Sequence, residues 1–245
     1  MESFSESAAM GRSRGGLGEG SPAAPPVPAH SPYEALVAPD VPGVGEGQRL
    51  GAEPLEAFFA RTPRLAVAFS GGCDSAYLLA AAKRAGCEVG AYLMATAFQP
   101  AFEQADAWRL AEDLGVGLVV VEADVLAHPD VCANGPDRCY RCKGLIFGAL
   151  VQAAAGDGFP VLADGTNASD DPARRPGFRA LAEQGVASPL RRAAMTKEAV
   201  RAASRRLGLF TADKPRFSCL AAHVPTGEPI TAARLDEAAR SCGIL

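Results

Sequence analysis

The 245-residue sequence contains a glycine pair between a predicted buried strand and a predicted helix. The loop has the sequence Ser70-Gly71-Gly72-Cys73-Asp74-Ser75. Glycines let a backbone approach a phosphate closely, and the first amides of a helix are unpaired donors at the positive end of its dipole. Ser70 and Ser75 add hydroxyls, and Asp74 is suited to Mg²⁺ or to a loop amide. Because the Gly-Lys-Ser/Thr of a Walker A motif is absent, the loop predicts phosphate binding without γ-phosphate transfer.

Two cysteines, Cys139 and Cys142, form a second chemical motif at the start of a predicted helix. The helix dipole and basic neighbours such as Lys143 favour thiolates there. A Cys-x-x-Cys pair suits zinc, an iron–sulfur cluster or redox exchange. A third cysteine, Cys219, is expected in a loop on the same ligand-binding side. Of the remaining four cysteines, Cys132 has no assigned role. The other three are predicted to pack as small apolar residues: Cys73, Cys87 and Cys242.

Composition and charge exclude two classes of protein, those that coat nucleic acids and those that span a membrane. The formal net charge is −4, whereas proteins that coat nucleic acids are strongly basic. No stretch approaches the roughly 18–20 apolar residues that cross a bilayer, so a membrane partner is not expected. The first six residues lack the basic start and apolar core of a secretory signal. We therefore expect a reducing cytoplasm, where clustered cysteines indicate metal or redox chemistry rather than disulfides.

The secondary structure that must position these groups alternates between strand and helix. The expected strands are 64–69, 88–95, 117–122, 160–163 and 186–188. The expected helices are 53–60, 75–85, 101–114, 140–155, 177–184, 197–207 and 232–241. Thr196 and Thr231 are the predicted N-caps of the last two helices. The pattern predicts an α/β fold with a doubly wound, Rossmann-like parallel sheet, in which ligands bind beyond the carboxyl ends of the strands.

Residues 1–50 differ in amino-acid composition from the rest of the chain. They contain eight Gly, seven Pro and six Ser, with little periodic apolar content. Such a segment buries too little surface to offset its ordering entropy. We expect a disordered leader over 1–50 and one catalytic domain over 51–245.

Polar residues follow the predicted strand at 160–163. Asp164, Thr166 and Asn167 are expected at the carboxyl edge of the sheet, where they position a nucleotide or substrate; a turn held by Asx hydrogen bonds is the alternative. Arg175 is expected to receive a phosphate or carboxylate. Other side chains are expected to be structural: Trp108 in the core, and Arg191, Arg192, Arg205 and Arg206 as solvated charges at helix ends.

The glycine loop resembles the PP-loop of the ATP pyrophosphatase superfamily, whose members hold the pyrophosphate of ATP and transfer AMP to a substrate oxygen. Further motifs follow in one order, and together they resemble the LarE family from about residue 53 onward. They are Arg138-Cys139-Tyr140-x-Cys142-Lys143, Asp164-Gly165-Thr166-Asn167, Arg175-Pro176-Gly177, Ser188-Pro189-Leu190, Thr196-Lys197, Asp213-Lys214-Pro215, Cys219-Leu220-Ala221 and Pro225-x-Gly227-Glu228-Pro229-Ile230-Thr231. LarE enzymes thiolate the pyridinium precursor of the nickel-pincer nucleotide cofactor.

The resemblance implies a two-stage reaction that uses ATP and Mg²⁺. ATP adenylates a carboxylate of pyridinium-3,5-dicarboxylate mononucleotide, and sulfur then displaces AMP. Two sulfur sources stay open: a 4Fe–4S cluster held by Cys139, Cys142 and Cys219, which is favoured, or Cys219 itself, sacrificed to dehydroalanine. Zinc on these three with Cys132 is a third interpretation. The resemblance further implies a homo-oligomer and a protein that resupplies sulfur.

Two departures from the family pattern indicate a divergent member. The family has Ser-Arg after Cys-Leu-Ala, where this chain has Ala222-His223, and the change removes a permanent charge expected to grip phosphate. The family also continues into a basic C-terminal segment, whereas this sequence stops at Leu245. The alternatives are a PP-loop tRNA thiolase or 7-cyano-7-deazaguanine synthase-like enzyme, and a degenerate nucleotide-binding module with structural zinc.

Overall fold

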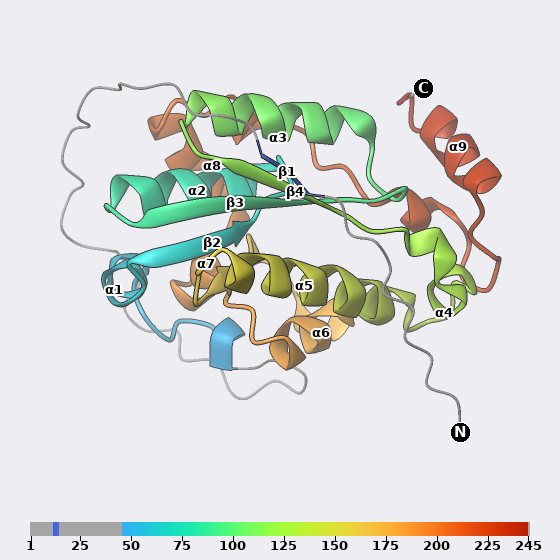
Figure 1. Cartoon of the computed structure of the whole chain (residues 1–245), viewed down its shortest axis with the longest axis horizontal. Coiled ribbons are helices and arrows are strands. Elements are labelled where there is room, and N and C mark those ends of the chain that lie inside the picture. Colours follow the sequence, from blue (N-terminus) through green and yellow to red (C-terminus); the bar gives the residue numbers. More distant parts are fainter. Residues whose placement is uncertain (1–11, 15–45, 245) are drawn as a thin grey trace.

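A computed structural model describes residues 12–14 and 46–244, and its centre is a five-stranded sheet of order β1-β4-β3-β2-β5 (Figure 1). Four neighbouring strands, from β4 to β5, run parallel, and β1 pairs antiparallel with β4. The strands are β1 Arg12–Arg14, β2 Arg64–Ala68, β3 Glu88–Ala95, β4 Leu118–Glu122 and β5 Leu162–Ala163. The prediction of a doubly wound, Rossmann-like α/β sheet is confirmed.

Helices cover both faces of this sheet, with α2, α3 and α8 on one side and α5 and α6 on the other (Figure 1). The α-helices are α1 Leu55–Arg61, α2 Cys73–Arg84, α3 Ala101–Asp113, α4 Pro129–Cys132, α5 Arg138–Gly156, α6 Gly177–Glu183, α7 Pro189–Arg192, α8 Lys197–Arg206 and α9 Ala232–Ser241. The short 3₁₀ helices are η1 Glu46–Gln48, η2 Val125–Ala127, η3 Pro172–Arg174, η4 Phe210–Asp213 and η5 Leu220–His223. No helix in the described part of the chain is long and apolar enough to cross a membrane.

The apolar strands divide the core into two layers. Because successive side chains of a strand point to opposite faces, Leu65 and Val67 pack with α2, α3 and α8, while Ala66 packs with α5 and α6. The predicted caps are confirmed, since Thr196 Oγ1 accepts from the Ala199 amide (3.2 Å) and Thr231 Oγ1 accepts from Arg234 (3.3 Å). Regular packing on both faces leaves the loops at the strand ends free to carry chemistry.

The predicted leader, residues 1–50, lies largely outside the described residues. Two short segments of it are described, and both contact the rest of the fold. Residues 12–14 pair with β4, and η1 packs with Gln48 1% exposed. The backbone around η1 also bonds to the α7 region, where the Ser188 amide donates to Gly47 O (2.8 Å) and Gly51 donates to Arg191 O (3.3 Å). The packed body therefore begins before residue 51.

Three predictions need correction. Residues 186–188 form a single bridge, between Ala187 and Ala163, rather than a strand. Trp108 is 40% exposed, because the buried stripe of α3 runs through Ala107, Leu110 and Ala111 and Trp108 lies about 100° round the helix.

Arg191 and Arg192 are buried rather than solvated. Arg191 donates to Gln48 O (3.0 Å) and Asp170 O (2.9 Å), and Arg192 donates to Glu53 Oε1 (2.6 Å). The segment before α1 therefore covers both guanidiniums and satisfies them, which is a long-range contact that helix-end charge patterns do not reveal.

Candidate active site

The loop between β2 and α2 makes the predicted turn. Gly71 has φ +70°, and a Cβ there would lie 2.7 Å from the carbonyl oxygen of Glu103, so only glycine fits. Ser70 Oγ and Ser75 Oγ lie 3.2 Å apart, and Ser75 Oγ donates to Gly72 O (3.2 Å). The two hydroxyls therefore fasten the loop onto the first turn of α2.

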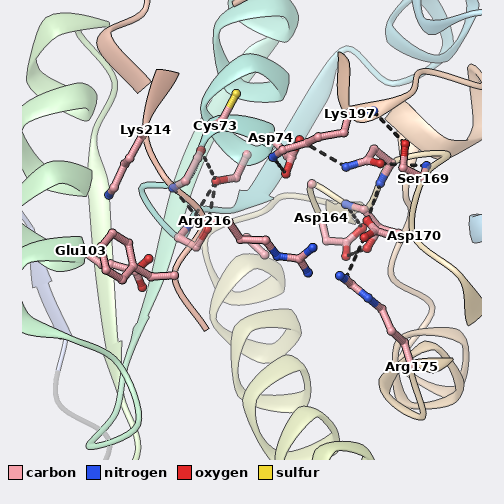
Figure 2. Close-up of a pocket in the computed structure, with 18 of the residues that line it drawn as sticks. Cys73, Asp74, Glu103, Asp164, Ser169, Asp170, Arg175, Lys197, Lys214 and Arg216 are labelled. Atoms are coloured by element: carbon pink, nitrogen blue, oxygen red, sulfur yellow. Dashed lines mark hydrogen bonds and ion pairs between the residues drawn. The ribbon is translucent and has the colours of Figure 1, made fainter. Parts of the chain in front are cut away.

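A first pocket of about 340 Å³ opens at the carboxyl ends of β2 and β5 (Figure 2). It brings together every predicted nucleotide-binding residue except Gly71, which forms the turn behind it. These residues are Ser70, Gly72, Asp74, Ser75, Asp164, Thr166, Asn167 and Arg175. Segments from opposite halves of the sequence thus meet at one edge of the sheet, as the parallel topology requires.

Asp74 is held by two residues that lie far away in the sequence, 93 and 123 positions later. Lys197 Nζ lies 2.6 Å from Asp74 Oδ2, and Asn167 Nδ2 donates to Asp74 Oδ1 (3.3 Å). Gly165 lets the two loops approach, because a Cβ there would lie 2.7 Å from the Ser75 amide nitrogen. Asp74 is therefore a fixed anion with one oxygen facing a cation and the other facing an amide.

Asp164 is the most buried carboxylate of the pocket. Its Oδ1 accepts from Ser188 Oγ (2.6 Å) and from the Thr166 amide (3.2 Å), and its Oδ2 accepts from the Thr166 hydroxyl. Burial raises the pKa of Asp164, and the charge of Lys143 offsets part of that effect. The side chain lines the pocket and closes an Asx turn. The turn is therefore present, and positioning of a nucleotide or substrate by Asp164 stays a prediction.

Arg175 has an internal partner in this structure. Its Nη1 lies 2.9 Å from Asp170 Oδ1, and Asp170 Oδ2 accepts from the Asn167 amide (3.0 Å). The guanidinium still lines the pocket, where its contact with a phosphate stays a prediction.

Further basic residues of the pocket had no predicted role. Lys214 Nζ lies 2.5 Å from Asp106 Oδ2 and donates to Gly71 O (3.3 Å). Arg201 donates to Ala212 O (2.6 Å) and Lys214 O (2.9 Å), and so holds the segment that contains these two residues against α8. One sequence signal was available, because Lys197 and Arg201 are four residues apart and share a helix face.

A second pocket of about 250 Å³ adjoins the first and is mostly apolar. The two pockets share four lining residues: Ala68, Ser70, Glu103 and Phe147. Burial raises the pKa of Glu103, and the charge of Lys214 opposes that effect. Cys142 and Cys219 also line the second pocket, which puts two of the predicted sulfur residues next to the glycine loop.

The three predicted metal cysteines are close enough to interact electrostatically. Burial raises the pKa of Cys142 to about 12, with Cys219 adding to the effect. Cys219 is exposed at the surface, but desolvation by the protein atoms around its thiol raises its pKa, whereas the Ala221 amide and the charge of Arg138 lower it. Cys139 is exposed, and Arg138 Nη2 lies 3.3 Å from its Sγ.

Other cysteines occupy different surroundings. Cys73 and Cys87 are buried, which confirms that they pack as apolar residues. Cys132, in α4, donates to the carbonyls of Val125 (3.6 Å) and Leu126 (3.4 Å) in the preceding η2. In the described part of the chain, no three His, Cys, Asp or Glu side chains form a group arranged to hold a metal ion. The 4Fe–4S cluster and the zinc site accordingly stay predictions.

The amino-acid sequence of the chain is similar to those of known proteins. No family model matches the chain. The uncharacterized protein slr1717 of Synechocystis sp. is 36% identical over 193 residues, which cover 77% of this chain and 71% of slr1717. The chain belongs to the slr1717 family.

Two further relatives of this slr1717-family protein are known. The pyridinium-3,5-bisthiocarboxylic acid mononucleotide synthase of Lactiplantibacillus plantarum is 32% identical over 69% of this chain and 62% of the synthase. The uncharacterized protein MJ0830 of Methanocaldococcus jannaschii is 27% identical over 65% of this chain and 60% of MJ0830. The chain thus spans slightly less than two thirds of these two relatives, and the match to the synthase supports a LarE-type relationship.

Asn134 is a structural residue of this slr1717-family protein that the sequence analysis missed. Its Nδ2 donates to the carbonyls of Val224 (3.3 Å), Pro225 (2.8 Å) and Glu228 (3.0 Å). The side chain is buried, and its backbone has φ +53°, which asparagine tolerates. Asn134 thereby ties the segment after Cys219 to the turn that precedes α5 and its cysteines.

His223 lies away from both pockets of the slr1717-family protein, although it stands where the LarE pattern has arginine. Its ring nitrogens lie 3.6 Å from Cys242 Sγ, at the end of α9. It is not among the lining residues of either pocket. A phosphate in the first pocket would therefore need its charge balanced by other cations.

Proposed function

We propose that this chain is an ATP-dependent sulfur transferase that adenylates a substrate carboxylate, releases pyrophosphate and then replaces AMP with sulfur. One observation carries the proposal: the pocket built on the glycine loop shares a wall with the pocket that contains Cys142 and Cys219. An acyl adenylate formed at the boundary of the two pockets would therefore lie beside the sulfur that attacks it. Proximity of this kind removes much of the entropic cost of a second step.

The first pocket supports binding of a triphosphate. Lys197 and Lys214 line it together with the first turn of α2, whose amides favour anions. Asp74 and Asp164 would hold Mg²⁺, which prefers carboxylate oxygens and would neutralise charge on the leaving pyrophosphate. The apolar lining of the second pocket supports a flat base or ring next to the phosphates.

The second pocket supports delivery of sulfur. The raised pKa values of Cys142 and Cys219 keep their thiols protonated at neutral pH, so attack requires loss of the Cys219 proton. Arg138 stabilises the thiolate form of Cys219. Cys139, Cys142 and Cys219 would hold a 4Fe–4S cluster, which would supply a sulfide at its unligated iron and would need resupply. If Cys219 is the donor instead, its thiolate would displace AMP to form a thioester. A base would then remove the Cα proton of Cys219 as the Cβ–Sγ bond breaks, which leaves dehydroalanine and a thiocarboxylate.

The name of the Lactiplantibacillus relative supports the substrate class. A synthase of pyridinium-3,5-bisthiocarboxylic acid mononucleotide makes a thiocarboxylate on a mononucleotide. We propose pyridinium-3,5-dicarboxylate mononucleotide as the acceptor for this chain. A tRNA acceptor is less well supported, because the formal net charge of the chain is −4.

The test is purification under anaerobic conditions, followed by iron and sulfide analysis and an assay of pyrophosphate release. We expect release that depends on both ATP and the mononucleotide acceptor. An iron–sulfur absorption that is lost in Cys139→Ala, Cys142→Ala and Cys219→Ala would assign the cluster, and loss of one H₂S from Cys219 after turnover would assign sacrifice. ATP binding without pyrophosphate release for any carboxylate acceptor would refute the transferase, and zinc without iron would favour a structural module.

A further inference from the structure

Arg216 differs from the other guanidiniums and ammoniums that line the first pocket. Within the described residues, the other basic residues contact a carboxylate, a carbonyl or an aromatic ring: Lys197, Lys214, Arg175, Arg201 and Lys143. Arg216 has no ion pair or hydrogen bond within the same part of the chain, and it is exposed. Figure 2 shows its guanidinium extending from the loop that precedes Cys219 into the pocket.

The loop that carries Arg216 is anchored by hydrogen bonds at both ends, and the residues between the anchors are exposed to solvent. At one end, Lys214 binds Asp106 and the carbonyl of Gly71. At the other end, the Leu220 amide donates to Phe98 O (2.9 Å). Residues 215–219 between these anchors are exposed. Between the anchors the Phe217 ring packs edge-on against Phe102, and a further contact made by Arg216 would restrict this short segment more strongly.

We propose that Arg216 binds a phosphate group held in the first pocket and thereby fixes the position of Cys219, three residues further along the loop. A guanidinium offers two parallel N–H donors to phosphate oxygens, so a single residue can set both distance and orientation. Because the loop is anchored at Lys214 and Leu220, docking Arg216 moves the thiol of Cys219 within the second pocket. Arg216 is a positioning residue, and this role rests on the proposed function.

The first test measures the order of the loop in the protein as purified. Chymotrypsin cleaves after Phe217, whose ring packs edge-on against Phe102 at 4.7 Å and is 37% exposed. We expect Mg²⁺-ATP to slow this cleavage several-fold in the wild type and to leave it unchanged in Arg216→Gln. Separate arms with pyrophosphate and with nicotinic acid mononucleotide distinguish the nucleotide from the acceptor as the source of the phosphate. Arg206→Gln removes a charge from an exposed site outside the pocket and serves as the control.

The second test separates positioning from binding. We expect Arg216→Gln to weaken ATP binding by about tenfold, as for loss of a charge-assisted hydrogen bond, and to reduce sulfur incorporation more than pyrophosphate release at saturating ATP. Arg216→Lys should restore part of both. Equal protection from chymotrypsin in wild type and Arg216→Gln, or protection by none of the three ligands, would overturn the proposal. Failure of the wild type to release pyrophosphate would instead count against the proposed function.

Discussion

Lys197 Nζ on α8 lies 2.6 Å from Asp74 Oδ2 in the first turn of α2, and the two side chains are only 25% and 24% exposed. This ion pair joins the glycine loop to a helix 123 residues later. Because Asn167 also donates to Asp74, the carboxylate has little freedom. The pair therefore fixes the arrangement of charges at this side of the pocket.

We predict that Asp74→Asn and Lys197→Gln each lower ATP-dependent pyrophosphate release, by about a hundredfold for the aspartate, as is typical for one preorganised electrostatic group. Since the two groups act as a unit, the double variant should lose less than the product of the single effects. Glu198→Gln, at the next and exposed position of α8, is the matched control and should keep full activity. Fully multiplicative effects would show that the ion pair does not act as a unit.

We predict that Gly165→Ala weakens ATP binding and lowers the free energy of unfolding by about 1–3 kcal/mol, because the new methyl would overlap the start of α2. A Cβ at this position would lie 2.7 Å from the Ser75 amide nitrogen and 3.0 Å from Asp74 Cβ. Gly144→Ala in α5 is the control, since nothing lies within 4 Å of its Cβ position. That variant should gain up to about 1 kcal/mol from helix propensity. Calorimetry and chemical denaturation give both values, and equal stability of the two variants would contradict the close approach.

We predict that Asn134 stabilises the folded state through both its side-chain amide and its backbone conformation. Asn134→Gly keeps the positive φ but leaves three carbonyl oxygens without their donor, at a cost of about 1–3 kcal/mol. Asn134→Ala should cost about 1 kcal/mol more, since alanine is strained at φ +53°. Denaturation curves measure both costs. If alanine and glycine destabilise equally, the backbone conformation at this position carries no strain.

Stability should depend on pH through Asp164, whose pKa is raised by burial from its usual value near 3.8. The native state therefore binds a proton that the unfolded state releases, and the free energy of unfolding falls as pH rises from about 4 through the raised pKa. Asp164→Asn removes this titration while its side-chain oxygen can still accept from Ser188. We expect the stability of the variant relative to the wild type to increase over this pH range and then level off. Parallel denaturation curves from pH 4 to 8 would contradict the assignment.

Much of the site could be predicted from the sequence because it rests on local patterns. A buried strand, two glycines and a helix start are contiguous in the chain, so the loop at 70–75 follows from backbone geometry alone. The loops after β2 and β5 meet because parallel strands end at the same edge of the sheet. The caps at Thr196 and Thr231 are likewise local hydrogen bonds.

Contacts between distant segments were decided only by the tertiary structure. The burial of Arg191 and Arg192 depends on the segment before α1, and the exposure of Trp108 depends on which face of α3 meets the sheet. The pairing of Lys197 with Asp74, and the direction in which Arg216 extends, depend on how α8 and the following loop pack against α2. Types and spacings of residues determine which groups the chain carries and which turns it makes. Their distances and partners arise from long-range packing, which no local pattern encodes.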